Sequence, residues 1–174
     1  MLRFLLPVLL VGLISALWFG LPSATTAPMP MVRAVLSGFS EVPAISTTGS
    51  GSFEAKVSDL VIEYVLSYEA LEGTPTLAAH IHLGQADVNG GVAVFLCGGG
   101  GRPACTPGSG TFTGTITAAD VIGPTAQGLA PGEFGELVRA ILKGATYANV
   151  HTGPHPGGEI RGQIRGENFG GAGP

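Results

Sequence analysis

Hydrophobic and polar residues alternate with a period of two along most of the chain after residue 31, in short runs separated by Gly, Pro, Asn or Asp. Such alternation is typical of strands with one buried face, and the separating residues are those that favour tight turns. The pattern predicts about eight strands, over residues 33–37, 51–58, 61–68, 77–83, 92–96, 110–116, 147–152 and 159–165.

The stretch between the sixth and seventh strands has a different periodicity. Residues 118–121 are expected to form a helical turn, and residues 133–143 place apolar side chains at helical spacing before Gly144. The other connections are only a few residues long, so neighbouring strands should pair in antiparallel fashion. The predicted fold is all-β, an antiparallel β-sandwich or partly open barrel of about eight strands with one short helix.

Composition and charge narrow the functional classes. The 174 residues suffice for one domain, and 29 glycines, 13 prolines and only 11% charged residues suit short strands joined by many turns. The net charge of −4 is scattered along the chain, whereas a nucleic-acid-binding protein needs a clustered basic face. Nucleic acid is therefore not expected as a partner.

The N-terminal residues have the pattern of an export signal. Arg3 precedes an apolar run over residues 4–21, and small residues follow at positions 23–27. We expect a signal peptide over 1–27, a linker over 28–31, a domain over 32–166 and a Gly-rich tail over 167–174. The alternative is an uncleaved N-terminal anchor, which would be the chain's contact with a membrane. Either arrangement places the domain outside the cytoplasm, secreted, periplasmic or at the cell surface.

The two cysteines agree with this location. Cys97 and Cys105 flank a flexible Gly-rich segment that lets the two sulfurs meet. We expect a disulfide that closes this loop. A thiolate metal site or a redox pair is the alternative, but the spacing is neither the two-residue redox motif nor the doubled motif of zinc sites.

All four histidines lie in two short stretches. In the first, His80 and His82 are two residues apart on a predicted strand, so both side chains project from one face while Ala79 and Ile81 face the core. Two neutral imidazoles so placed can converge on copper, zinc or nickel. The alternative is a pair of solvated histidines on an exposed strand face.

The second stretch, residues 147–164, is predicted to be a hairpin with a six-residue connection over 153–158. Parity places Asn149 and His151 on one face that points away from the core, and His155 at the tip of the connection. Glu159 and Arg161 should share a face and form an ordinary surface ion pair.

These stretches resemble the CHRD domain, the module first named from chordin, which also occurs alone in exported bacterial proteins. The resemblance covers about residues 32–165 and implies an extracellular β-rich domain without an assigned activity in its bacterial members. It rests on three groups of residues, which are Leu36-Ser37-Gly38 with Glu41-Val42-Pro43, Ala79-His80-Ile81-His82-Leu83-Gly84 with Asn89-Gly90-Gly91-Val92, and Tyr147-Ala148-Asn149-Val150-His151-Thr152 with Gly157-Gly158-Glu159-Ile160-Arg161-Gly162-Gln163-Ile164.

Three functions remain open at this point. The first is a non-enzymatic binding module with a surface copper or zinc site, and an extracellular protein partner fits this class. Its expected ligands are His80, His82 and His151, with His155 or a water molecule completing the shell, and its expected supporting polar network is Asn149, Glu159 and Arg161.

The second is an enzyme similar to copper/zinc superoxide dismutases, which share the architecture and a His-x-His strand. The sequence lacks a counterpart of their bridging-histidine loop and zinc-site aspartate. The third is a structural or protein-interaction domain of the cell surface, in which the same polar residues form a hydrogen-bonded hairpin corner and hold no metal.

Overall fold

Nine strands form a single antiparallel sheet in residues 29–166, the part of the chain that this computed structural model describes. The expected leader over 1–27 and tail over 167–174 lie outside the described residues. The strands are β1 (Met31–Ser37), β2 (Ser50–Val57), β3 (Ile62–Glu69), β4 (Thr76–Leu83), β5 (Gly91–Cys97), β6 (Gly110–Ile116), β7 (Thr146–Thr152), β8 (Ile160–Gln163) and β9 (Arg165–Gly166).

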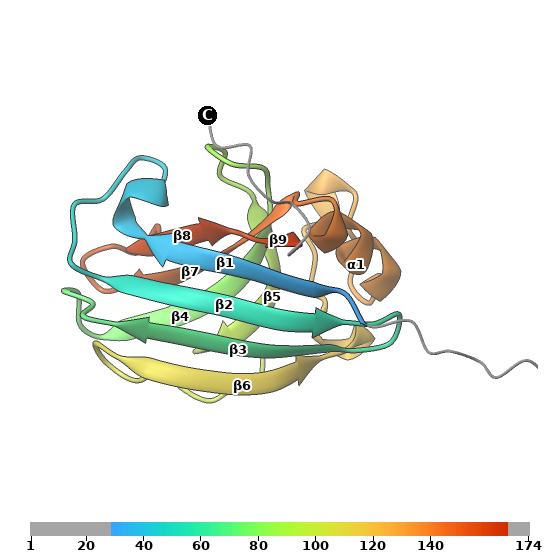
Figure 1. Cartoon of the computed structure of the whole chain (residues 1–174), viewed down its shortest axis with the longest axis horizontal. Helices are drawn as coiled ribbons and strands as arrows, with labels where there is room; N and C mark the ends of the chain where they lie inside the picture. The colour runs from blue at the N-terminus through green and yellow to red at the C-terminus, as the bar shows by residue number, and fades with distance from the viewer. Residues whose placement is uncertain (1–28, 167–174) are drawn as a thin grey trace, which may run out of the picture.

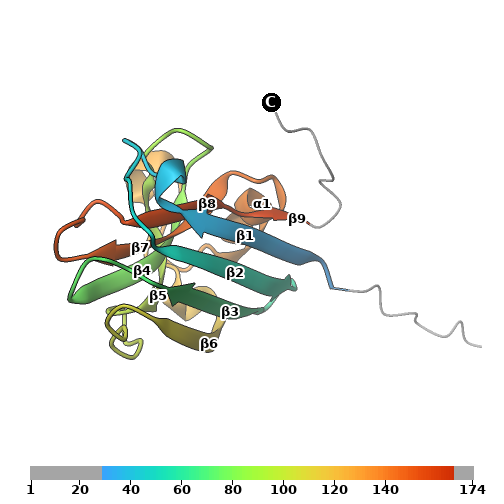
Figure 2. The ribbon, with the colours of Figure 1, turned by 60° about the vertical axis from the view of Figure 1, so that its left-hand side comes forward.

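The sheet curls into a nearly closed barrel, in agreement with the predicted fold class. Its strand order is β5-β4-β7-β8-β1-β2-β3-β6, and β9 pairs with β1. Figures 1 and 2 show β1, β2, β3 and β6 as one wall, with β7, β8, β4 and β5 behind it. The two end strands, β5 and β6, approach each other. The Tyr64 hydroxyl on β3, the neighbour of β6, also reaches across and donates to the Leu96 carbonyl on β5 at 2.9 Å.

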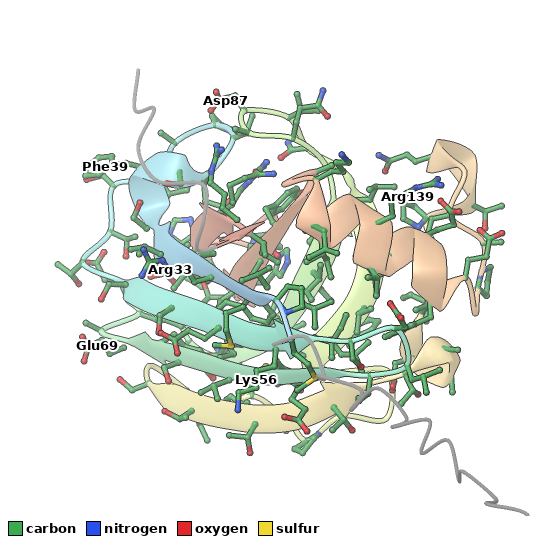
Figure 3. The ribbon with its side chains drawn as sticks, turned by 45° about the vertical axis from the view of Figure 1, so that its right-hand side comes forward. Arg33, Phe39, Lys56, Glu69, Asp87 and Arg139 are labelled. Atoms are coloured by element: carbon green, nitrogen blue, oxygen red, sulfur yellow. A yellow bond between two sulfur atoms is a disulfide. The ribbon has the colours of Figure 1, made fainter. Side chains whose placement is uncertain are left out.

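The core occupies the space between the two walls. Along β1 the side chains of Val32, Ala34 and Leu36 are buried, whereas Arg33 and Val35 are exposed, as the alternation predicts. Figure 3 shows the charged side chains of the outer faces, among them Lys56 and Glu69. The opposite wall contributes the buried residues Ala79, Ile81, Val94, Leu96, Ala148, Val150, Ile160 and Ile164 to the same core.

One short helix, α1 (Phe134–Leu142), packs on this core in the predicted place. Its buried residues Phe134, Leu137, Val138 and Ile141 recur at helical spacing. Gly144 follows the helix with a positive φ of 69°, which a glycine adopts without strain. No helix among residues 29–166 is long and apolar enough to span a membrane.

The predicted disulfide between Cys97 and Cys105 is present, with the two Cα atoms 5.2 Å apart. Inside the loop that it closes, the Arg102 guanidinium donates to the Thr115 carbonyl on β6 at 2.8 Å and pairs with Asp120 at 2.8 Å. The loop therefore fastens the end of β5 to the other end strand of the sheet.

Candidate metal centre

Three histidines from two neighbouring strands meet at one point. β4 and β7 pair antiparallel, with His80 opposite Asn149 and Ala78 opposite His151. One ring nitrogen from each of His80, His82 and His151 lies within 4.8 Å of the other two. The structure thus brings together the three rings that strand parity placed on one side of the sheet.

This face of the sheet is covered, and the expectation of an exposed surface site is wrong. His80, His82 and His151 are only 8%, 7% and 8% exposed. The ring of Phe95 lies 4.5 Å from that of His80, and the ring of Tyr147 stacks on that of His82 at 4.8 Å between centroids. Strand parity identifies the face correctly, but it says nothing of the aromatic rings and loops that cover it.

Arg161 fastens a loop over the site instead of pairing with Glu159. Its guanidinium lies 3.4 Å from the centre of the Tyr147 ring and donates to the carbonyls of Val88 at 2.7 Å and Gln85 at 3.1 Å. The expected ion pair with Glu159 is absent from the described residues.

A second contact holds the same cover. The side-chain amide of Asn89 donates to the Val42 carbonyl at 3.0 Å, which joins the loop after β4 to the segment after β1. Figure 3 labels Phe39 and Asp87 on these two segments, at the same end of the molecule. The cover over the histidines therefore consists of two loops that are hydrogen-bonded to each other.

Glu159 lies outside the histidine group, and its carboxylate holds neighbouring segments of the fold together. Its fully buried carboxylate accepts hydrogen bonds from Thr47 Oγ1, Thr152 Oγ1 and the backbone nitrogen of Glu72, each at 2.7 Å, and from that of Gly73 at 3.1 Å. Burial raises the pKa of Glu159, but these four hydrogen bonds outweigh burial and hold the pKa below its usual value. The residue joins three segments of the fold.

Backbone carbonyls fix the tautomers of two of the histidines. His82 Nδ1 lies 2.9 Å from the Gly90 carbonyl oxygen, and His151 Nδ1 lies 3.0 Å from that of Pro156. A carbonyl oxygen can only accept, so both Nδ1 atoms carry the proton and both Nε2 atoms present lone pairs. His82 Nε2 is buried and has no hydrogen-bond partner among the described residues. Metal-ligating histidines are usually held in this way through the second ring nitrogen.

The approach of Gly90 to His82 requires a glycine. A Cβ atom at position 90 would lie 1.8 Å from the Leu83 carbonyl oxygen, so any side chain would displace the loop. The Asn-Gly-Gly segment after β4 is therefore part of the site, because it places the carbonyl that orients the His82 ring.

The remaining histidine contact joins the two strands. His80 Nδ1 and His151 Nε2 lie 2.9 Å apart, and since His151 Nε2 is a lone pair, His80 donates this hydrogen bond. In a tetrahedral zinc site with Zn–N bonds of about 2.0–2.1 Å, two ligand nitrogens are about 3.3 Å apart. To bind an ion, this pair would have to open by a few tenths of an ångström, the His80 tautomer would have to change, and the His82 nitrogen, within 4.8 Å of the other two, would have to approach the same point.

Burial keeps these imidazoles neutral. Burial first, and then repulsion from the neighbouring rings, lowers the pKa of His80 to about 3 and that of His82 to about 4. Burial also lowers the pKa of His151. A neutral imidazole is the form that binds a metal ion, so no ligand proton has to be removed near neutral pH.

Asn149 adds an oxygen to the group. Its Oδ1 lies 2.9 Å from His151 Nε2, and the side chain is 2% exposed. In the neutral state His151 Nε2 accepts from His80 Nδ1, so it has no proton to donate to the Asn149 oxygen beside it. Such an arrangement favours a cation, which fits the supporting role predicted for Asn149.

Two other residues lie at positions that the sequence did not predict. His155 is half-buried on the loop between β7 and β8 and does not belong to the group of converging ring nitrogens. Glu41 was noted only as part of a motif, yet its buried carboxyl group lies near the Asn149 side chain, since a Cβ at Gly158 would be 2.2 Å from Glu41 Oε1 and 2.9 Å from Asn149 Nδ2. An acidic residue between Phe39-Ser40 and Val42-Pro43 gives no periodic signal that would place it at the site.

The comparison with protein families decides the assignment. The CHRD domain model matches residues 32–164, most of the chain. The chain belongs to the CHRD domain family. Comparisons with the curated proteins and with the solved structures give no significant match. In this CHRD domain the three motifs on which the resemblance rests converge at the histidines, with Glu41 from the first, His80 and His82 from the second and His151 from the third.

Proposed function

We propose that this CHRD domain is an extracellular, non-enzymatic module that binds one copper or zinc ion through His80, His82 and His151. The observation that carries the proposal is the convergence of three ring nitrogens within 4.8 Å, at a place where His82 Nε2 is buried without a partner among the described residues. A buried polar atom without a partner is costly, and a bound ion would remove that cost.

The donor set restricts the ion. Neutral imidazoles suit copper and zinc, whereas calcium and magnesium require a shell of oxygen ligands. Three histidines would leave room on the ion for a further ligand, and Asn149 Oδ1, 2.9 Å from His151 Nε2, could supply it. A bound ion of this kind would act as a Lewis acid and would cross-link β4 to β7.

Three observations support the extracellular location. The Cys97–Cys105 disulfide is compatible with an oxidising compartment, the family is extracellular, and the N-terminal residues have the pattern of an export signal. A protein partner in that compartment remains part of the proposal, and the scattered net charge of −4 argues against nucleic acid.

Two other functions compete with this proposal. A superoxide-dismutase-like enzyme needs open access to the ion, and the covered ligands, at most 8% exposed, give no support to it. Copper-loaded protein should dismutate superoxide no faster than free copper ion. A purely structural role for the histidine network predicts that His151→Ala lowers thermal stability equally with and without metal, whereas metal binding predicts loss of the metal-dependent increment.

The direct test is a titration of metal-stripped protein with zinc or copper. We expect one ion per chain, and we expect a variant with both His80→Ala and His82→Ala to lose it. The matched control is His155→Ala, which removes a histidine outside the group and should keep full uptake. Equal uptake by the double variant and the wild type would refute the proposal.

A further inference from the structure

Glu41 is a buried carboxyl group next to the metal centre. It follows the 3-10 helix η1 (Gly38–Ser40) and is 6% exposed, and its Oε1 has no hydrogen-bond partner among the described residues. Gly158, with a positive φ of 130°, makes room for it, since a Cβ there would lie 2.2 Å from Glu41 Oε1. The fold therefore accommodates this carboxyl group closely.

Asn149 connects Glu41 to the histidines. Its Nδ2 lies on the Glu41 side, since a Cβ at Gly158 would be 2.9 Å from Asn149 Nδ2 and 2.2 Å from Glu41 Oε1, and its Oδ1 lies 2.9 Å from His151 Nε2. A carboxylate can only accept, so a carboxylate on this side favours the orientation in which the amide nitrogen faces Glu41 and the amide oxygen faces the ring nitrogens. The direction of the Asn149 amide thus depends on Glu41.

The charges around the centre make this carboxyl group important. Three neutral imidazoles leave the charge of a bound ion uncompensated, and the buried Arg161 nearby already contributes a positive charge. Among the described residues the other buried carboxylate is Glu159, whose oxygens are occupied by four hydrogen bonds. Glu41 is therefore the buried carboxylate that remains available to balance a cation.

We propose that Glu41 is the charge-compensating residue of this centre, a positioning residue that acts through Asn149 and makes the site favour divalent over monovalent ions. The inference rests on the proposed function, because it assumes that the three histidines hold an ion. It also assigns the charge of the preferred ion, which is divalent, and the residue that selects it.

The electrostatics of Glu41 support this role. Burial raises its pKa to about 7, although the positive charge of Arg161 on β8 opposes the rise. The other titratable groups around Asn149 are His82 on β4 and His151 on β7, both with lowered pKa values. A carboxyl group with this pKa is readily ionised by a cation that arrives nearby.

The test compares zinc with silver(I), a monovalent ion that also binds imidazole, in chloride-free buffer near pH 7.5. In Glu41→Gln, which keeps the shape and removes the charge, we expect zinc affinity to fall about 10–100-fold, the range typical for residues behind metal ligands. Coulomb energy is proportional to the ion's charge, so the loss of binding energy for silver should be half of that for zinc. The fold-loss in silver affinity is then the square root of the fold-loss for zinc, about 3–10-fold. Glu41→Asp should keep the wild-type ratio of the two affinities.

Glu54→Gln, which removes an exposed carboxylate on β2, is the matched control and should change neither affinity. Equal losses for both ions in Glu41→Gln, or no loss for either, would overturn the inference. Failure of the wild type to bind zinc would instead overturn the proposed function. If Glu41→Gln does not fold, the wild type provides the same test, since its zinc-to-silver affinity ratio should fall between about pH 8 and about pH 5.5 as Glu41 is protonated. A constant ratio would contradict the proposal.

Discussion

Acidification should weaken zinc binding far less here than at an exposed three-histidine site. An ordinary imidazole with a pKa of about 6.5 is about 90% neutral at about pH 7.5 and about 3% neutral at about pH 5, a roughly 30-fold loss for each ligand. Three such ligands would lose about 10⁴-fold in affinity. This is the expectation for histidines on an open strand face.

The buried ligands behave differently. With pKa values of about 3 for His80 and about 4 for His82, these rings remain about 99% and about 90% neutral at about pH 5. The lowered pKa of His151 acts in the same direction. Protonation of Glu41, with its pKa of about 7, removes a favourable charge and accounts for most of the remaining loss. We expect a total loss of at most about 100-fold, the upper range for a residue behind the ligands.

The assay is competition with a chelator of known pH dependence, at about pH 7.5 and about pH 5. Glu41→Gln should bind more weakly at the higher pH and show a smaller change between the two. Phe95→Ala, which exposes the His80 ring, should increase the dependence on pH. A 10⁴-fold loss in the wild type would show that the imidazoles titrate as free groups, and the reasoning from burial would be refuted.

Three further predictions concern the scaffold. Without metal, the Glu41→Gln variant should be less stable to urea at about pH 5 than at about pH 7. Between these two pH values His80 and His82 gain protons in the unfolded chain but stay neutral in the folded one, so acid favours unfolding. Equal stabilities at the two pH values would contradict the lowered pKa values. Glu159→Gln should lower the unfolding free energy by about 2–4 kcal/mol, since charged hydrogen bonds are lost, while zinc stoichiometry stays at one; loss of zinc would place Glu159 in the centre. Gly90→Ala should weaken zinc binding at least about 10-fold by displacing the carbonyl that orients His82, and unchanged affinity would rule out that role.

Much of the fold could be predicted because the barrel walls have one apolar face. β1, β2, β3 and β6 alternate between the core and solvent, so the period of two identifies these strands to within about two residues. The same period placed His80, His82 and His151 on one side of the sheet. The helix was found for the same reason, because its buried residues recur at helical spacing.

The cover over the histidines and the positions of Glu41 and Glu159 could not be predicted, because they depend on how loops far apart in the sequence pack together. Every residue of β7 is buried, and no pattern along that strand indicates that its polar face is covered by other segments. Glu159 precedes β8 and does not lie in it, so strand parity did not apply, and the predicted pair with Arg161 was wrong. Glu41 reaches the centre only because the segment after β1 folds over it, a tertiary contact without a local signal.

The central claim is that this domain holds an ion in its native compartment. Elemental analysis of untagged protein purified from that compartment tests it most directly, with the His80→Ala and His82→Ala double variant expressed and purified in parallel. We expect copper or zinc at a ratio close to one per wild-type chain and only trace metal in the variant. Trace metal in the wild type, or equal metal in both proteins, would contradict it.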